Sequence, residues 1–207
     1  IGHQALKSAT GSGNLAIGWK AGVLIVGGEN NMALGYGALT GLTTGVSNIV
    51  IGKNALNAAV LSESYNIVIG QDAMGDADEG TDGGSFDKNV AIGHNAWWPI
   101  EENVVIGYEA LMTEDLGDGN TAIGYRALKV QNGDDAATYN TVIGSQAGMA
   151  ISNSVQNVII GYKAMTEHTT GHSNTVIGYN AMSKTNESAG TLTSSHNVFI
   201  GNLSGGG

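Results

Sequence analysis

Six acidic residues gather in one Gly-rich stretch of the chain, between positions 72 and 87. Within it, Asp76, Asp78 and Asp82 stand at alternate positions around Gly80. Short carboxylates at alternate residues of a loop can converge on Ca²⁺, although the bidentate Glu that ends an EF-hand loop is missing. A solvated acidic loop has the same composition. Calcium is therefore the one cofactor that the sequence suggests, at Asp76, Asp78 and Asp82, with a plain surface loop as the alternative reading.

Motifs for catalysis are absent from the sequence. It contains no Walker loop, no dinucleotide fingerprint and no nucleophile elbow. It has no Cys, which excludes disulfides, thiolate metal sites and cysteine nucleophiles. Carboxylate pairs of the kind that cleave glycans occur in variable stretches, as at Glu101 and Glu102. We therefore expect no enzyme, with a glycan depolymerase as the lesser alternative.

The formal net charge of −10 limits the partners of the chain. Phosphate backbones are bound by clustered Lys and Arg, which disfavours nucleic acid as a partner. The same charge disfavours an anionic membrane surface. No apolar run reaches the roughly 18 residues of a membrane span, so the sequence predicts no membrane insertion.

A short motif, Asn-x-x-Ile-Gly-x-x-Ala, recurs along the whole chain. Its glycines are 14 to 23 residues apart: Gly2, Gly18, Gly35, Gly52, Gly70, Gly93, Gly107, Gly124, Gly144, Gly161, Gly178 and Gly201. Asn precedes eleven of them by four residues, as with Asn48, Asn103, Asn120 and Asn174. Variable spacing around a constant core is typical of a solenoid, in which extra residues loop out of stacked coils. Residues 1–207 are therefore predicted to form one all-β solenoid domain of about twelve coils, a fragment of a longer fibrous protein.

The residues around each glycine predict two short strands per coil. The three residues before it are mostly β-branched, and both faces of such a strand would be apolar, as in Ile49, Val50 and Ile51. One solenoid buries only one face, so we expect another copy of the chain to cover the other. After the glycine, a mostly polar residue is followed by Ala and then usually by Leu or Met, which predicts a second short strand with Ala and Leu packed inward and polar groups outward. The asparagines are expected to hold a turn and to stack as an amide ladder, with an Asn-lined ligand site as the alternative.

Two segments carry a resemblance to known families: 120–128, NTAIGYRAL, and 174–182, NTVIGYNAM. They resemble the head repeats of trimeric autotransporter adhesins and, more closely, the related repeats of phage tail-fibre proteins. The resemblance covers nearly the whole chain and implies a homotrimeric, left-handed parallel β-roll. The longer, variable spacing and the Ala where adhesin heads more often have Ser favour a tail fibre in a virion. The alternative is an adhesin head on a bacterial surface, anchored in the outer membrane.

Recognition of a cell-surface glycan or protein is expected where the repeat varies, because loops on a rigid scaffold commonly bind partners. The longest variable stretches are Gly75 to Lys88, Lys129 to Tyr139 and Ser183 to His196. The receptor-binding candidates in or near them are Asp76, Asp78, Asp82, Phe86, Tyr139, Asn186 and His196. Trp97 and Trp98 either fill a subunit junction or hold a ligand. A row of Tyr and Trp directly after the glycines either packs coils or chains together or stacks on sugars.

Overall fold

The computed structural model describes residues 1–57, 62–75, 86–96, 101–112, 117–130, 138–183 and 195–205. They belong to two compact units, Ile1–Glu102 and Asn103–Gly207, each built from the same repeated coil. The described residues form strands and turns and contain no helix, hence no helix that could cross a membrane.

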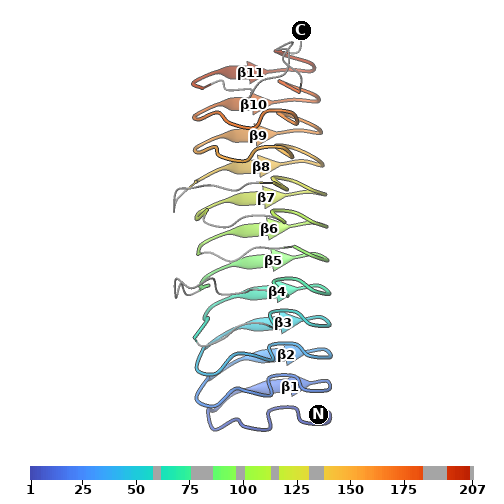
Figure 1. Cartoon of the computed structure of the whole chain (residues 1–207), viewed down its shortest axis with the longest axis vertical. Coiled ribbons are helices and arrows are strands. Elements are labelled where there is room, and N and C mark those ends of the chain that lie inside the picture. The colour runs from blue at the N-terminus through green and yellow to red at the C-terminus, as the bar shows by residue number, and fades with distance from the viewer. Residues whose placement is uncertain are drawn as a thin grey trace. The chain divides into compact units, whose positions relative to one another are not determined.

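A strand of three residues precedes each repeat glycine from Gly18 onward. The first unit contains β1 (Leu15–Ile17), β2 (Met32–Leu34), β3 (Ile49–Ile51), β4 (Ile67–Ile69) and β5 (Val90–Ile92). The second contains β6 (Val104–Ile106), β7 (Thr121–Ile123), β8 (Thr141–Ile143), β9 (Val158–Ile160), β10 (Thr175–Ile177) and β11 (Val198–Ile200). Within each unit every strand pairs in parallel with the next along the chain (Figure 1), and equivalent repeat positions face each other, as Val50 faces Val68. The predicted all-β solenoid is thereby confirmed.

The middle residue of each strand forms the inside of the coil. Val50, Val142 and Ile159 are fully buried, whereas the residues on either side of them point outward. This follows from the two-residue period of an extended chain, which sends neighbouring side chains to opposite faces. The core is completed from the other side of the coil by the Ala and the Leu or Met that follow the glycine, such as Ala164 and Met165.

The second predicted strand is wrong, because the segment after the glycine is a turn. Two of its residues have left-handed backbones, two and four positions after the glycine, as with Lys163 at φ 53° and Met165 at φ 51°. A strand needs negative φ throughout, so this segment cannot be extended. The inward packing of Ala and Leu was predicted correctly, but a turn delivers these side chains. Within the described residues, each coil from Gly18 onward therefore has one strand, where the sequence suggested two.

The glycine of the motif is required by both conformation and space. Gly161 has φ 136°, and a Cβ built on it would lie 2.3 Å from the carbonyl oxygen of Gly178 in the next coil. Gly144 stands in the same relation to Gly161, at 2.5 Å. A side chain is disfavoured at this φ, and here it would also collide with backbone. The glycines thus set the close stacking of successive coils.

Candidate functional site

The motif asparagines form a buried ladder. The backbone N–H of Asn48 donates to Oδ1 of Asn31 at 3.0 Å, and the Asn66 N–H donates to Oδ1 of Asn48 at 3.0 Å. In the second unit the same bond joins Asn120 to Asn103 at 2.7 Å. The Nδ2 groups donate to backbone carbonyls, as from Asn48 to Glu63 at 2.7 Å. These amides form their hydrogen bonds inside the coil. The ladder therefore stabilises the stacked coils and does not offer a ligand site at the surface.

Most of the predicted receptor-binding residues lie outside the described residues, namely Asp76, Asp78, Asp82, Trp97, Trp98 and Asn186. Of the others, Tyr139 and His196 are exposed. Both stand five residues before a repeat glycine, where left-handed backbones at φ 49° and 62° turn the chain toward the strand. Phe86 instead packs into the core, 7% exposed, and its carbonyl accepts the Asn66 amide at 2.6 Å. Among the three members of the set that the structure describes, Tyr139 and His196 present side chains to solvent.

The outward face of the strands is an apolar surface in each unit. In the first unit it includes Leu15, Ile17, Ile49 and Ile67, which are 37% to 45% exposed. In the second unit the corresponding face is formed by the isoleucines that end β6 to β11, half-buried in β6 to β10 and exposed in β11, with a Thr as the first residue of three of these strands. Contiguous exposed apolar surface of this kind is uncommon on soluble monomers and marks places where another molecule packs. We call this surface the strand face.

The aromatic residues directly after the glycines form stacked pairs between neighbouring coils. Trp19 stacks on Tyr36 in the first unit with ring centroids 4.6 Å apart. In the second unit Tyr108 stacks on Tyr125 at 5.7 Å, and Tyr162 on Tyr179 at 5.4 Å. All six rings remain partly exposed. The row therefore packs neighbouring coils together, one of the two roles expected from sequence, and it still presents ring surface to solvent.

A small ion cluster lies beside this row in the second unit. Oε2 of Glu109 is 2.8 Å from both Nε of Arg126 and Nζ of Lys129. The hydrogen bond from Lys129 is the main cause that lowers the pKa of Glu109 to about 2, while partial burial opposes it. Tyr108 also hydrogen-bonds to Glu109, and this bond raises the pKa of the tyrosine hydroxyl. The cluster joins two successive coils electrostatically.

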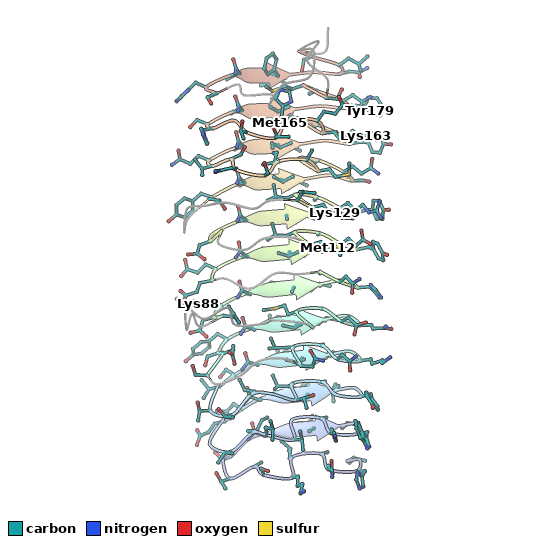
Figure 2. The ribbon with its side chains drawn as sticks, viewed as in Figure 1. Lys88, Met112, Lys129, Lys163, Met165 and Tyr179 are labelled. Atoms are coloured by element: carbon teal, nitrogen blue, oxygen red, sulfur yellow. The ribbon has the colours of Figure 1, made fainter. Side chains whose placement is uncertain are left out.

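A pocket of about 590 Å³ opens on the second unit. Its walls come from three successive coils and are Gln146, Met149, Ala150, Lys163, Thr166, Glu167, Asn180 and Ser183. Lys163 and Asn180 directly follow Tyr162 and Tyr179 of the aromatic row, and Gln146 occupies the same position after its own glycine, Gly144. Figure 2 shows Lys163 and Tyr179 at the same edge of the unit. The volume falls within the range of pockets that hold small ligands, roughly 300–1,000 Å³.

Metal binding finds no support in the part of the chain that the structure describes, where no group of three or more His, Asp or Glu side chains lies close enough to hold an ion. The proposed calcium residues lie outside that part. Of the carboxylate pair considered for glycan cleavage, Glu102 forms an exposed ion pair with Lys88 at 3.1 Å.

Neither the ion cluster nor the pocket was predicted, although the repeat register contains a signal for the cluster. Glu109 and Arg126 both stand two residues after a repeat glycine in consecutive coils, so the stacking places their opposite charges side by side. The pocket depends on the side chains of three coils together, and no single motif indicates it.

No family model, curated protein or solved structure matches the chain.

Proposed function

We propose that this chain is a non-enzymatic segment of a fibrous attachment protein, a phage tail fibre that assembles as a homotrimer and binds a glycan or protein receptor on a cell surface. The observation that carries the proposal is the strand face. One coil buries only the middle residue of each strand and leaves the two flanking apolar residues outward. A repeated apolar surface on a repeated scaffold calls for an equally repeated partner, and another copy of the same chain supplies one.

A trimer would bury the strand faces of its three copies against one another. Three strand faces can surround one axis with their isoleucines meeting in the middle, and the resemblance to trimeric repeats implies this arrangement. The buried middle residues, such as Val68, face the interior of their own coil and are not available for it. The residues proposed at the trimer axis are thus the first and third of each strand.

The attachment role rests on the division between constant and variable residues. The motif residues have structural roles: the asparagines form the ladder, the glycines allow close stacking of the coils, and the apolar residues form the core. The sequence varies most between the motifs, and Tyr139 and His196, at the ends of two long variable stretches, expose their side chains. A trimer repeats each such stretch three times, which converts weak single contacts into avidity. Calcium at Asp76, Asp78 and Asp82, which lie in one of these stretches, is part of the proposal.

The head of a bacterial surface adhesin is the second candidate, since the same strand face and the same variable stretches suit it. The two candidates differ in target. A tail fibre binds bacteria, whereas an adhesin head binds the tissue or matrix that a bacterium colonises. Glycan cleavage on the same scaffold is a third candidate, and loss of polymer length on incubation with surface polysaccharide would reveal it.

Attachment of the labelled 207-residue chain to a panel of bacterial strains and of animal cells tests the proposal. We expect saturable binding to a subset of the bacteria. Tyr139→Ala should weaken it, whereas Tyr65→Ala should not. Tyr65 is the matched control because it is equally exposed, 60% against 59%, and it also stands five residues before a repeat glycine, outside the three long variable stretches. Binding to no cell of the panel would contradict the proposal.

A further inference from the structure

The aromatic row of the second unit lacks one ring. The residues directly after its glycines are, in order, Tyr108, Tyr125, Ser145, Tyr162, Tyr179 and Asn202. Ser145 thus stands between two stacked tyrosine pairs. In the whole sequence no other non-aromatic residue of this row has aromatic residues in both neighbouring coils.

Backbone hydrogen bonds at this corner show that the three coils around Ser145 are consecutive rungs. The Gln146 N–H donates to the carbonyl of Tyr125 at 2.8 Å, and the Lys163 N–H donates to the carbonyl of Ser145 at 3.0 Å. Two coil steps of about 4.8 Å therefore separate Tyr125 from Tyr162, or about 9.6 Å in total. The hydroxymethyl side chain of Ser145 fills little of that space. The Arg126 guanidinium and the Lys163 ammonium lie over the Tyr125 and Tyr162 rings, 4.9 and 5.4 Å from the ring centres, so these two cations border the space as well. We call the space between the two tyrosines the slot.

The width of this slot suits one additional ring. A ring midway between Tyr125 and Tyr162 would lie about 4.8 Å from each, within the roughly 4.5–7 Å over which ring pairs attract. The two tyrosine pairs of the same row stack at 5.7 and 5.4 Å. A ligand ring would therefore take the place that a fifth aromatic side chain of the second unit would otherwise occupy, and would join the two pairs into one continuous stack.

The residues around the slot are polar, so they favour a ring-shaped ligand that carries polar groups on its edge. Gln146 and Lys163, next in sequence to Ser145 and Tyr162, line the pocket of about 590 Å³ together with Asn180. The buried Oδ1 of Asn180 accepts no hydrogen bond from the described residues. Nζ of Lys163 lies 5.4 Å from the centre of the Tyr162 ring and can donate. A ligand here needs apolar faces for the tyrosines and a rim of hydroxyls for the amides and the ammonium.

We propose that this slot and the adjoining pocket bind a pyranose ring within a surface polysaccharide. The C–H groups on the faces of a pyranose carry partial positive charge and suit the negative faces of tyrosine rings. Its hydroxyls radiate from the edge, where Gln146, Lys163 and Asn180 can exchange hydrogen bonds with them. The pocket volume leaves room for a second sugar beside the first. The inference rests on the proposed attachment function and assigns its ligand class.

Filling the slot is the sharpest test, because the chain already tolerates the change elsewhere. Five of the twelve positions directly after a repeat glycine are Tyr, so Ser145→Tyr should fold normally and melt no lower than wild type. It should reduce sugar binding at least about tenfold, because it occupies the ligand position and removes two stacking contacts. Gln71→Tyr is the matched control, since Gln71 occupies the same coil position in the first unit, with Lys53 and His94 in the adjoining coils.

Saturation-transfer NMR on the 207-residue chain provides the measurement, with millimolar methyl glycosides of glucose, galactose, N-acetylglucosamine and glucuronic acid as probes. We expect transfer to the face protons of at least one probe in the wild type and in Gln71→Tyr, and its loss in Ser145→Tyr and Tyr162→Ala. Unchanged transfer in folded Ser145→Tyr, or no transfer to any probe in the wild type, overturns the inference. If Ser145→Tyr also attaches to cells like the wild type, the slot is refuted and the attachment function stands, whereas a wild type that attaches to no cell refutes the function.

Discussion

Asn140 and Asn157, in neighbouring coils, are joined by two hydrogen bonds to one oxygen. Both the backbone N–H and the Nδ2 group of Asn157 donate to Oδ1 of Asn140, each at 3.0 Å. Asn157 repeats the relation on its other side, where its own Oδ1 accepts the backbone N–H of Asn174 at 2.9 Å. One side chain therefore bonds both to the coil before it and to the coil after it.

Asn157→Ala should destabilise the fold by about 2–4 kcal/mol, because buried groups on both sides lose their partners. The Asn174 N–H loses the Asn157 oxygen, and the Gly171 carbonyl loses an Nδ2 donor at 2.8 Å. Asn197→Ala is the matched control in the last described coil, where the amide is partly exposed and its bond to Asn174 is longer, 3.2 Å. Urea denaturation followed by circular dichroism measures both. Equal midpoints for the two variants would contradict a ladder that stabilises the coils.

Gly161→Ala should cost about 3 kcal/mol or more, since it combines a disfavoured φ with a collision. The new Cβ would lie 2.3 Å from the Gly178 carbonyl oxygen, so the two coils would have to separate. Gly27→Ala is the control, because a Cβ there meets its nearest atom, on Thr44, only at 3.8 Å. Thermal melting of the two variants compares them. Similar melting temperatures would show that the coils can move apart at little cost.

The strand before each glycine could be predicted because its residues are apolar and bounded by Asn and Gly. The turn after the glycine was not predicted, because the left-handed backbone there is carried by ordinary residues such as Lys163 and Met165. Their conformation is maintained by the neighbouring coils, for example through the bond from the Lys163 N–H to Ser145 at 3.0 Å. A signal was nevertheless present: Gly22 and Gly148 replace the Leu or Met at the same left-handed position.

Contacts between coils could be predicted only for residues that occupy the same position relative to the glycine in consecutive repeats. Aligning the repeats on their glycines places Glu109 beside Arg126, and Ser145 between Tyr125 and Tyr162. It does not place Lys129, which stands three residues beyond Arg126 and reaches back to Glu109 at 2.8 Å. The course of the chain beyond the motif decides that contact, and the motif contains no information about it.

The ion cluster predicts a specific acid sensitivity. The folded state lowers the pKa of Glu109 from its ordinary value of 4.5 to about 2. The ionised carboxylate is therefore the form that stabilises the fold: its contribution is complete above about pH 4.5 and is lost as the pH falls toward 2. Glu109→Gln should lower the melting temperature near neutral pH. The melting temperature of this variant should also fall less than that of the wild type between pH 4.5 and 2.

Glu102→Gln is the matched control for that measurement. Glu102 also pairs with a lysine, Lys88, at 3.1 Å, but both side chains are more than half exposed. Exposed pairs contribute little to stability, so this variant should follow the wild-type pH profile. Differential scanning calorimetry between pH 2 and 7 gives all three curves. Parallel curves for the wild type and Glu109→Gln would remove the cluster as a source of stability.

Assembly through the strand face gives the last prediction. Ile49 and Ile67 face each other in the register of β3 and β4 and are 39% and 37% exposed in the single chain. Changing both to Lys should leave each coil folded, because the side chains point out of it. In the proposed trimer the same changes would bury unpaired ammonium groups, each at a cost of several kcal/mol, so the copies should separate.

Sedimentation equilibrium at micromolar concentration measures the outcome. The wild type should have about three times the chain mass of 21.1 kDa, and the double variant should have that mass alone. Leu24→Lys is the control, because Leu24 is as exposed as the strand-face residues, at 48%, but lies outside the strands. It should remain trimeric. A wild type that sediments as a monomer would refute the trimer, and a double variant that stays trimeric would move the contact to another surface. Because the face repeats in every coil, two lysines in adjacent coils interrupt only part of it, so dissociation of the double variant would also show that the copies join along the strand face cooperatively.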